Sequence, residues 1–165
     1  MTKIKKVFIF IALFIFIIIN CGYSNVTELE DRDFIIAIGI DRKDENKFDI
    51  TVFSADMNYF QNKSSTSNKK YITCACADNI NNGLYKINKR LKKNMYLGHT
   101  QIIFLNKSLL QNKKISSKIA IELENNTELN QKVKLIFVNN AQKFIKSHFS
   151  PDLLDYIKNK LDKKA

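Results

Sequence analysis

The chain has 165 residues, of which 27 are Lys or Arg and 16 are Asp or Glu, so its formal net charge at pH 7 is +11. This length suffices for one domain with a real core and is too short for two. A basic balance can indicate nucleic-acid binding, but the lysines are spread through every segment, and compact clusters occur only at Lys89–Lys93 and Lys158–Lys164. The composition therefore argues against a nucleic-acid partner. The positive charge would instead face solvent or attract the chain to an anionic lipid surface.

The first twenty residues have the pattern of an export signal. Lys3, Lys5 and Lys6 precede an uninterrupted apolar run of 13 residues at 7–19. A helix that crosses a membrane needs about 20 apolar residues, so this run is short for a span. The flanking lysines hold their end in the cytoplasm. We therefore expect residues 1–20 to be a signal peptide that directs export.

Cys21 comes directly after this segment and Asn20. A cysteine in this place resembles the lipobox of bacterial lipoproteins, in which the thiol accepts a diacylglyceryl group before cleavage makes it the new N-terminus. Ile18 and Ile19 suit the apolar positions of that motif, whereas Asn20 is larger than the usual Gly, Ala or Ser. We predict lipidation at Cys21, which would anchor the chain to membrane lipid almost permanently, because each buried methylene contributes about 0.8 kcal/mol. The alternative is an uncleaved signal anchor with an ordinary Cys21 and the same topology.

Strands dominate the next part of the chain, after a polar spacer that ends at Asp33. Residues 34–40 are apolar on both alternating faces, which predicts a strand covered on both sides. A charged turn at 41–46 leads to 47–56, where apolar and polar residues alternate, so the two segments are expected to form a hairpin. A polar loop at 61–70 then precedes a third strand at 71–76.

Helices and strands mix in the rest of the chain. Asp78 is a plausible N-cap for a helix whose apolar stripe consists of Ile80, Leu84, Ile87 and Leu91. The segment 96–105 is rich in strand-forming residues, with a bend or bulge at Gly98. A helix at 116–124, a strand at 133–138 and a short helix at 141–146 follow.

The last predicted helix begins at Ser150-Pro151-Asp152, a hydroxyl, a proline and a carboxylate in the order that suits a helix N-terminus. Its apolar stripe consists of Leu153, Leu154, Ile157 and Leu161. Since the elements show no regular βαβ alternation, we expect an α+β fold for residues 34–165: one domain with a mixed, mostly antiparallel sheet and helices packed on it.

The residues offer little for catalysis. The chain has no G-x-S-x-G, no glycine-rich phosphate loop and no H-E-x-x-H, and it contains two histidines, His99 and His148. His99 follows Gly98 at a strand and is expected to be structural, and His148 suits the end of a short helix. The pairs Asp31/Asp33 and Asp41/Asp44 are expected to be solvated carboxylates. We predict that the protein is not an enzyme.

Cys74 and Cys76 lie two apart in a predicted strand, so they share a face. A disulfide between them would close a small strained ring, and two ligands alone make a poor zinc site. We expect both to be small buried hydrophobes. No metal and no cofactor are predicted.

Three segments together resemble one family. After the lipobox-like cysteine come Asp33–Asp41, reading DFIIAIGID, then Leu91–Leu105, with an aromatic residue and LGH leading into an apolar strand, and then Leu135–Ala141. In their order and spacing they are similar to the Ger(x)C family, the C subunits of spore germinant receptors.

This resemblance implies a non-catalytic lipoprotein on the outer face of the cell or spore inner membrane. It implies integral-membrane A and B subunits as partners in a receptor that senses nutrients, and it makes Cys21 the lipidation site. Family members carry further domains after this one, so residues 34–165 would correspond to the N-terminal domain, preceded by the lipidated Cys21 and a spacer at 21–33. The alternative is a truncated or free-standing surface lipoprotein with no receptor role.

Overall fold

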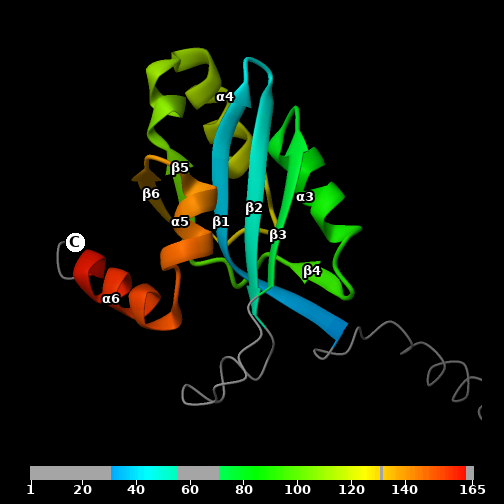
Figure 1. The fold of residues 1–165 in the computed structure, drawn as a ribbon, viewed down its shortest axis with the longest axis vertical. Coiled ribbons are helices and arrows are strands. Elements are labelled where there is room, and N and C mark those ends of the chain that lie inside the picture. The colour runs from blue at the N-terminus through cyan, green and yellow to red at the C-terminus, as the bar shows by residue number, and fades with distance from the viewer. Residues whose placement is uncertain (1–30, 56–70, 131, 163–165) are drawn as a thin grey trace, which may run out of the picture.

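The structure, a computed structural model, describes residues 31–55, 71–130 and 132–162. Its centre is β1 (Arg32–Asp44), which pairs antiparallel with β2 (Lys47–Ala55), and β2 pairs antiparallel with β3 (Tyr71–Ala77). On the other edge of β1 lie β4 (Asn94–Tyr96) and then β5 (Ile102–Asn106), both parallel to it. Parallel pairing of β5 with β6 (Lys134–Val138) completes the sheet order β3-β2-β1-β5-β6 (Figure 1).

The predicted α+β class with a mixed sheet is confirmed. The longest ladders are antiparallel, as expected, but the sequence pattern did not reveal the parallel pairs. The β5–β6 pair is parallel because α4 (Lys113–Glu124), preceded by the short 3₁₀ helix η2 (Lys107–Gln111), carries the chain from the end of β5 back to the start of β6. That connection is a β-helix-β crossover, the type that parallel neighbours require.

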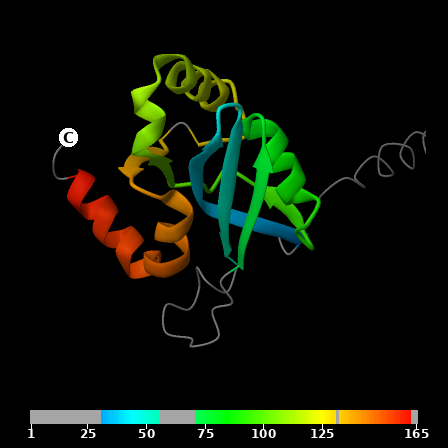
Figure 2. The ribbon, with the colours of Figure 1, turned by 45° about the horizontal axis from the view of Figure 1, so that its top comes forward.

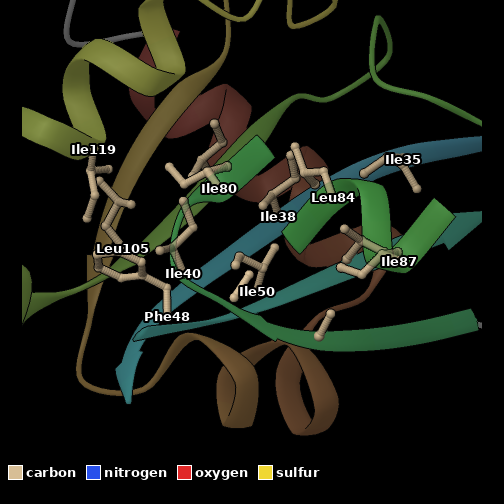
Figure 3. Packing of buried hydrophobic residues seen from close by; sticks show 14 of the residues in the cluster. Ile35, Ile38, Ile40, Phe48, Ile50, Ile80, Leu84, Ile87, Leu105 and Ile119 are labelled. Atoms are coloured by element: carbon tan, nitrogen blue, oxygen red, sulfur yellow. The ribbon is translucent and has the colours of Figure 1, made fainter. Parts of the chain in front are cut away.

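Helices cover both faces of the sheet, which explains why β1 is apolar on both sides. One face packs against α3 (Ile80–Asn88) and α4, and the other packs against α5 (Ala141–His148) and α6 (Pro151–Asp162) (Figure 2). In Figure 3 the side chains of Ile38 and Ile40 in β1 lie in one cluster with Ile80 and Leu84 of α3. The core is therefore divided by the sheet into two apolar layers.

A β-bulge at Ile36 decides which residues of β1 reach each layer. Ile35 pairs with Ser54, and Ala37 pairs with Phe53, so β1 has one residue more than β2 in this interval. The extra residue places Ile35 in the layer under α3 and both Ile36 and Ala37 in the layer under α5.

Several helix boundaries differ from expectation. Asn79, rather than Asp78, is the N-cap of α3, because its side chain accepts the hydrogen bond from the backbone N–H of Asn82 at 2.7 Å. Asp78 instead accepts from the side-chain amide of Asn82 at 2.9 Å. The predicted N-cap Ser150 of α6 does accept from the N–H of Leu153, at 3.2 Å. The loop predicted at 61–70 lies outside the described residues.

Candidate functional site

The connection between β4 and β5 follows the edge of β1 and bonds to it at the bulge. The Thr100 hydroxyl donates to the carbonyl oxygen of Ile35 at 3.2 Å, and the backbone N–H of Gln101 donates to the carbonyl oxygen of Ile36 at 2.9 Å. Thr100 is completely buried. The predicted bend at Gly98 is thus confirmed, since it lets one stretch of chain pair with β1 twice.

Three rings gather beside this bend. The ring of His99 lies 5.1 Å from that of Phe34 and 5.4 Å from that of Tyr96, centroid to centroid, and the Arg32 guanidinium lies 5.0 Å from the Tyr96 centroid. A Cβ on Gly98 would stand 2.6 Å from the Tyr96 hydroxyl oxygen, so a larger residue here would require the Tyr96 ring to move. The expectation that His99 helps to shape the local structure agrees with these contacts.

A polar hollow of about 450 Å³ opens at the same bend. Its lining includes the side chains of His99, Gln101, Asn130, Lys132 and Lys134. The side-chain oxygen of Gln101 is buried and has no hydrogen-bond partner in the described part of the chain. Amides and lysines of this kind can bind a polar or anionic group. The hollow is the strongest candidate binding site that the described residues offer.

Asp41 is buried, with 6% of its surface exposed, and the expectation of a solvated carboxylate at this position is wrong. Its Oδ1 accepts from the backbone N–H of Ala141 and from the side-chain amide of Asn106, each at 2.8 Å, and its Oδ2 accepts from the N–H of Gln142 at 2.8 Å. Asn140 accepts from the N–H of Lys143 at 2.6 Å. These bonds occupy the free N–H groups at the start of α5, so the role of Asp41 is to fix α5 on the sheet.

Cys74 and Cys76 are free thiols on β3. They are half-buried rather than buried as expected, because β3 is an edge strand and their face looks toward α5, while Ala75 and Ala77 enter the core under α3. The Cys74 sulfur accepts from the Gln142 side-chain amide at 3.1 Å. His148, in the last turn of α5, stacks on the ring of Phe144 at 5.6 Å.

Within the described ranges, no group of three or more His, Cys, Asp or Glu side chains is placed to hold a metal ion. None of the helices in those ranges has both the length and the apolar character needed to cross a membrane. Cys21, the predicted lipidation site, and the signal at 1–20 lie outside the described residues.

Comparison with protein families gives the decisive observation. The family model described as the spore germination protein N-terminal domain matches residues 25–165, which include every element of the fold. The chain belongs to this family. Membership confirms the resemblance inferred from Asp33–Asp41, Leu91–Leu105 and Leu135–Ala141, and it gives this spore germination domain a role related to germination.

Neither a curated protein nor a solved structure matches the chain. In this spore germination domain, each of the three segments that resemble the family forms a distinct part of the fold. The first supplies the central strand and the buried Asp41, the second supplies β4, the bend and β5, and the third supplies β6 and the start of α5. The three segments meet along β1, β5 and α5. Asp41 of the first segment bonds to Ala141 of the third and to Asn106, the residue that follows the second.

Sequence reasoning missed the network around Asp41. Asn106 links the Asp41 carboxylate to the carbonyl oxygen of Asn139, which its side-chain amide also contacts at 2.9 Å. Two local sequence patterns belong to this network: an Asp at the end of an apolar strand, and an Asn-Asn pair directly before a helix. Neither pattern alone indicates that the two lie together in the fold.

Proposed function

We propose that this chain is a lipid-anchored, non-catalytic subunit of a spore germinant receptor. In this proposal Cys21 carries the lipid, and the domain after it works with integral-membrane A and B subunits at the outer face of the spore inner membrane. The observation that carries the proposal is the placement of the family match, which begins at residue 25, four positions after Cys21 and the signal-like segment that precedes it.

The described structure supports a role in binding rather than in catalysis. The buried carboxylate of Asp41 is engaged by three donors and fixes a helix, and the ring of His99 packs among other rings. Two hollows on the described surface are suited to contacts with other molecules: the polar hollow at the β4–β5 bend and an apolar groove beside β6.

The test replaces the chromosomal gene with a Cys21→Ala variant in the spore-forming host. Mass spectrometry of the membrane fraction should find the wild-type protein beginning at Cys21 with added acyl mass, and should find the variant as unmodified precursor. Spores of the variant should germinate more slowly in nutrient, measured as the fall in optical density. Cys76→Ala is the matched control, because it removes a half-buried thiol within the domain and should leave both readouts unchanged.

Two results would contradict the proposal. A wild-type protein that keeps Met1 and carries no acyl group would show that Asn20 blocks processing and that the chain is held by an uncleaved signal. If the wild-type protein is acylated but the Cys21→Ala spores germinate as fast as wild type, the chain is a free-standing surface lipoprotein and not a receptor subunit.

A further inference from the structure

The two edges of the sheet differ in whether other groups bond to the backbone of the outer strand. At the β3 edge, cationic side chains of the α3 region occupy carbonyl oxygens: Arg90 donates to Cys74 at 2.5 Å and Lys86 donates to Cys76 at 3.0 Å. At the other edge, no strand among the described residues lies beyond β6 (Figure 1). Exposed strand edges of this kind are ready to pair with another chain.

The ladder between β5 and β6 shows which backbone groups of β6 are directed outward. The N–H of Lys134 donates to the carbonyl oxygen of Gln101 at 3.0 Å, so Lys134 directs its peptide groups toward β5, and Ile136 and Val138 do the same by alternation. Leu135 and Phe137 therefore direct their N–H and carbonyl groups away from the sheet.

The side chains of these two residues are exposed as well. Leu135 is 50% exposed and Phe137 is 41% exposed, although both are large and apolar. They line an apolar groove of about 310 Å³ together with Leu105, Leu109 and Ile119 from the sheet, η2 and α4. An open strand edge and an apolar groove therefore lie side by side, which is the arrangement that receives an added strand.

We propose that β6 pairs with β6 of a second copy of this chain, antiparallel and about a two-fold axis at Ile136. In this register Leu135 stands opposite Phe137 of the second copy, and Phe137 stands opposite Leu135. These are the residues with outward backbone groups, so each pair exchanges both N–H···O bonds. The five-residue strand is self-complementary because its outward residues are placed symmetrically about its centre.

Side-chain chemistry fits the same register. The facing pairs Leu135–Phe137 lie on the α4 side, where their exposed apolar surfaces cover one another. On the opposite side Ile136 meets its own copy, and Lys134 meets Val138, so no like charges are placed directly opposite each other. The strongly basic chain thus presents an edge at which two copies can approach without direct repulsion.

The test uses the full chain purified from membranes in mild detergent, with its molar mass measured by sedimentation. Wild-type protein should sediment with twice the mass of its single chain, once the bound detergent is subtracted. Leu135→Glu and Phe137→Lys should each sediment as monomers, because each places a charge opposite an apolar side chain. Mixing the two variants should restore a dimer, since one facing pair then joins opposite charges and the other remains Leu135–Phe137.

Ile121→Lys is the matched control, because Ile121 is 57% exposed on α4 and does not line the groove beside β6; this variant should remain dimeric. All variants should keep the circular dichroism spectrum of the wild type and unfold cooperatively, since the replaced side chains are exposed; the monomeric variants should melt somewhat lower, because association stabilises the folded state. Monomeric wild-type protein would overturn the proposal, and if Phe137→Lys then impaired germination, the edge would belong to a different polypeptide. Single variants that stay dimeric would show that the dimer does not form through the β6 edge. A mixture that stays monomeric would show that Leu135 does not face Phe137 of the second copy.

Discussion

Gly83 in α3 lies directly against Ile50 in β2. A Cβ on Gly83 would stand 3.0 Å from Cγ1 of Ile50 and would overlap its Cδ1. Both residues are buried between α3 and the sheet. Figure 3 shows Ile50 in one cluster with Leu84 and Ile87 of α3. Glycine at this point lets the helix approach the strand more closely than any other residue would.

The first prediction concerns Gly83→Ala. In most helices this change stabilises the protein, because alanine has the better helix propensity by about 1 kcal/mol. Here the sign is reversed, and we expect a loss of about 1–3 kcal/mol from overpacking against Ile50. Chemical denaturation should show this loss. In the double variant with Ile50→Val, which removes the Cδ1 methyl, the total loss should be smaller than the sum of the two single losses. Additive losses would show that the two residues do not compete for space.

The second prediction concerns Asp41→Asn. The amide keeps one acceptor oxygen and turns an NH₂ group toward donors, so part of the cap on α5 is lost. We expect the free energy of unfolding to fall by about 1–3 kcal/mol. Asp44→Asn, at the exposed end of the same strand, is the control and should change it by less than about 0.5 kcal/mol. Equal effects of the two variants would refute the capping role.

The third prediction concerns Thr100→Val, which keeps the shape of the side chain and removes the hydroxyl that donates to Ile35. The buried carbonyl at the bulge then loses a donor, and the expected cost is about 1–3 kcal/mol. Thr127→Val is the control, because Thr127 is exposed. Urea denaturation measures both; a Thr100→Val protein as stable as wild type would mean that the hydroxyl bond contributes nothing.

The fourth prediction concerns pH. The Asn82 side-chain amide that donates to Asp78, with a backbone N–H bond and the charges of Lys86 and Lys118, lowers the pKa of this carboxyl below its ordinary value of 3.8. A carboxyl whose pKa is lower in the folded state stabilises the fold above its unfolded pKa, and this contribution is lost as the pH falls through the folded value. Asp78→Asn should therefore melt below wild type at pH 7, with the gap closing below about pH 4. A gap that does not change with pH would contradict this.

The sequence predicted the elements that depend on local pattern. The double-sided strand at Phe34–Ile40, the bend at Gly98 and the helix start at Ser150 were all read correctly, because each follows from periodicity or from a residue with restricted conformational preferences. Of the predicted helix stripe, Ile80, Leu84 and Ile87 match the buried face of α3, whereas Leu91 lies beyond the end of this helix at Asn88.

Features that depend on distant residues could not be predicted. The burial of Asp41 results from Ala141 and Gln142, which lie about one hundred positions later in the chain. The order of the strands in the sheet decides that β5 lies parallel beside β1, and that Phe137 is exposed on the edge strand β6. Alternation within a strand does not reveal this order. The candidate hollow at Gln101 has the same origin, since its lining comes from two separate segments.

The central position of β1 has a mechanical consequence. The strand begins at Arg32, where the preceding chain leads toward Cys21, and it is hydrogen-bonded to β2 on one edge and to β4 and β5 on the other. Tension applied through that preceding chain acts along β1, so it must shear the ladders on both edges at once instead of opening them one bond at a time. A domain built in this way should resist unfolding when it is pulled from the N-terminal end of β1.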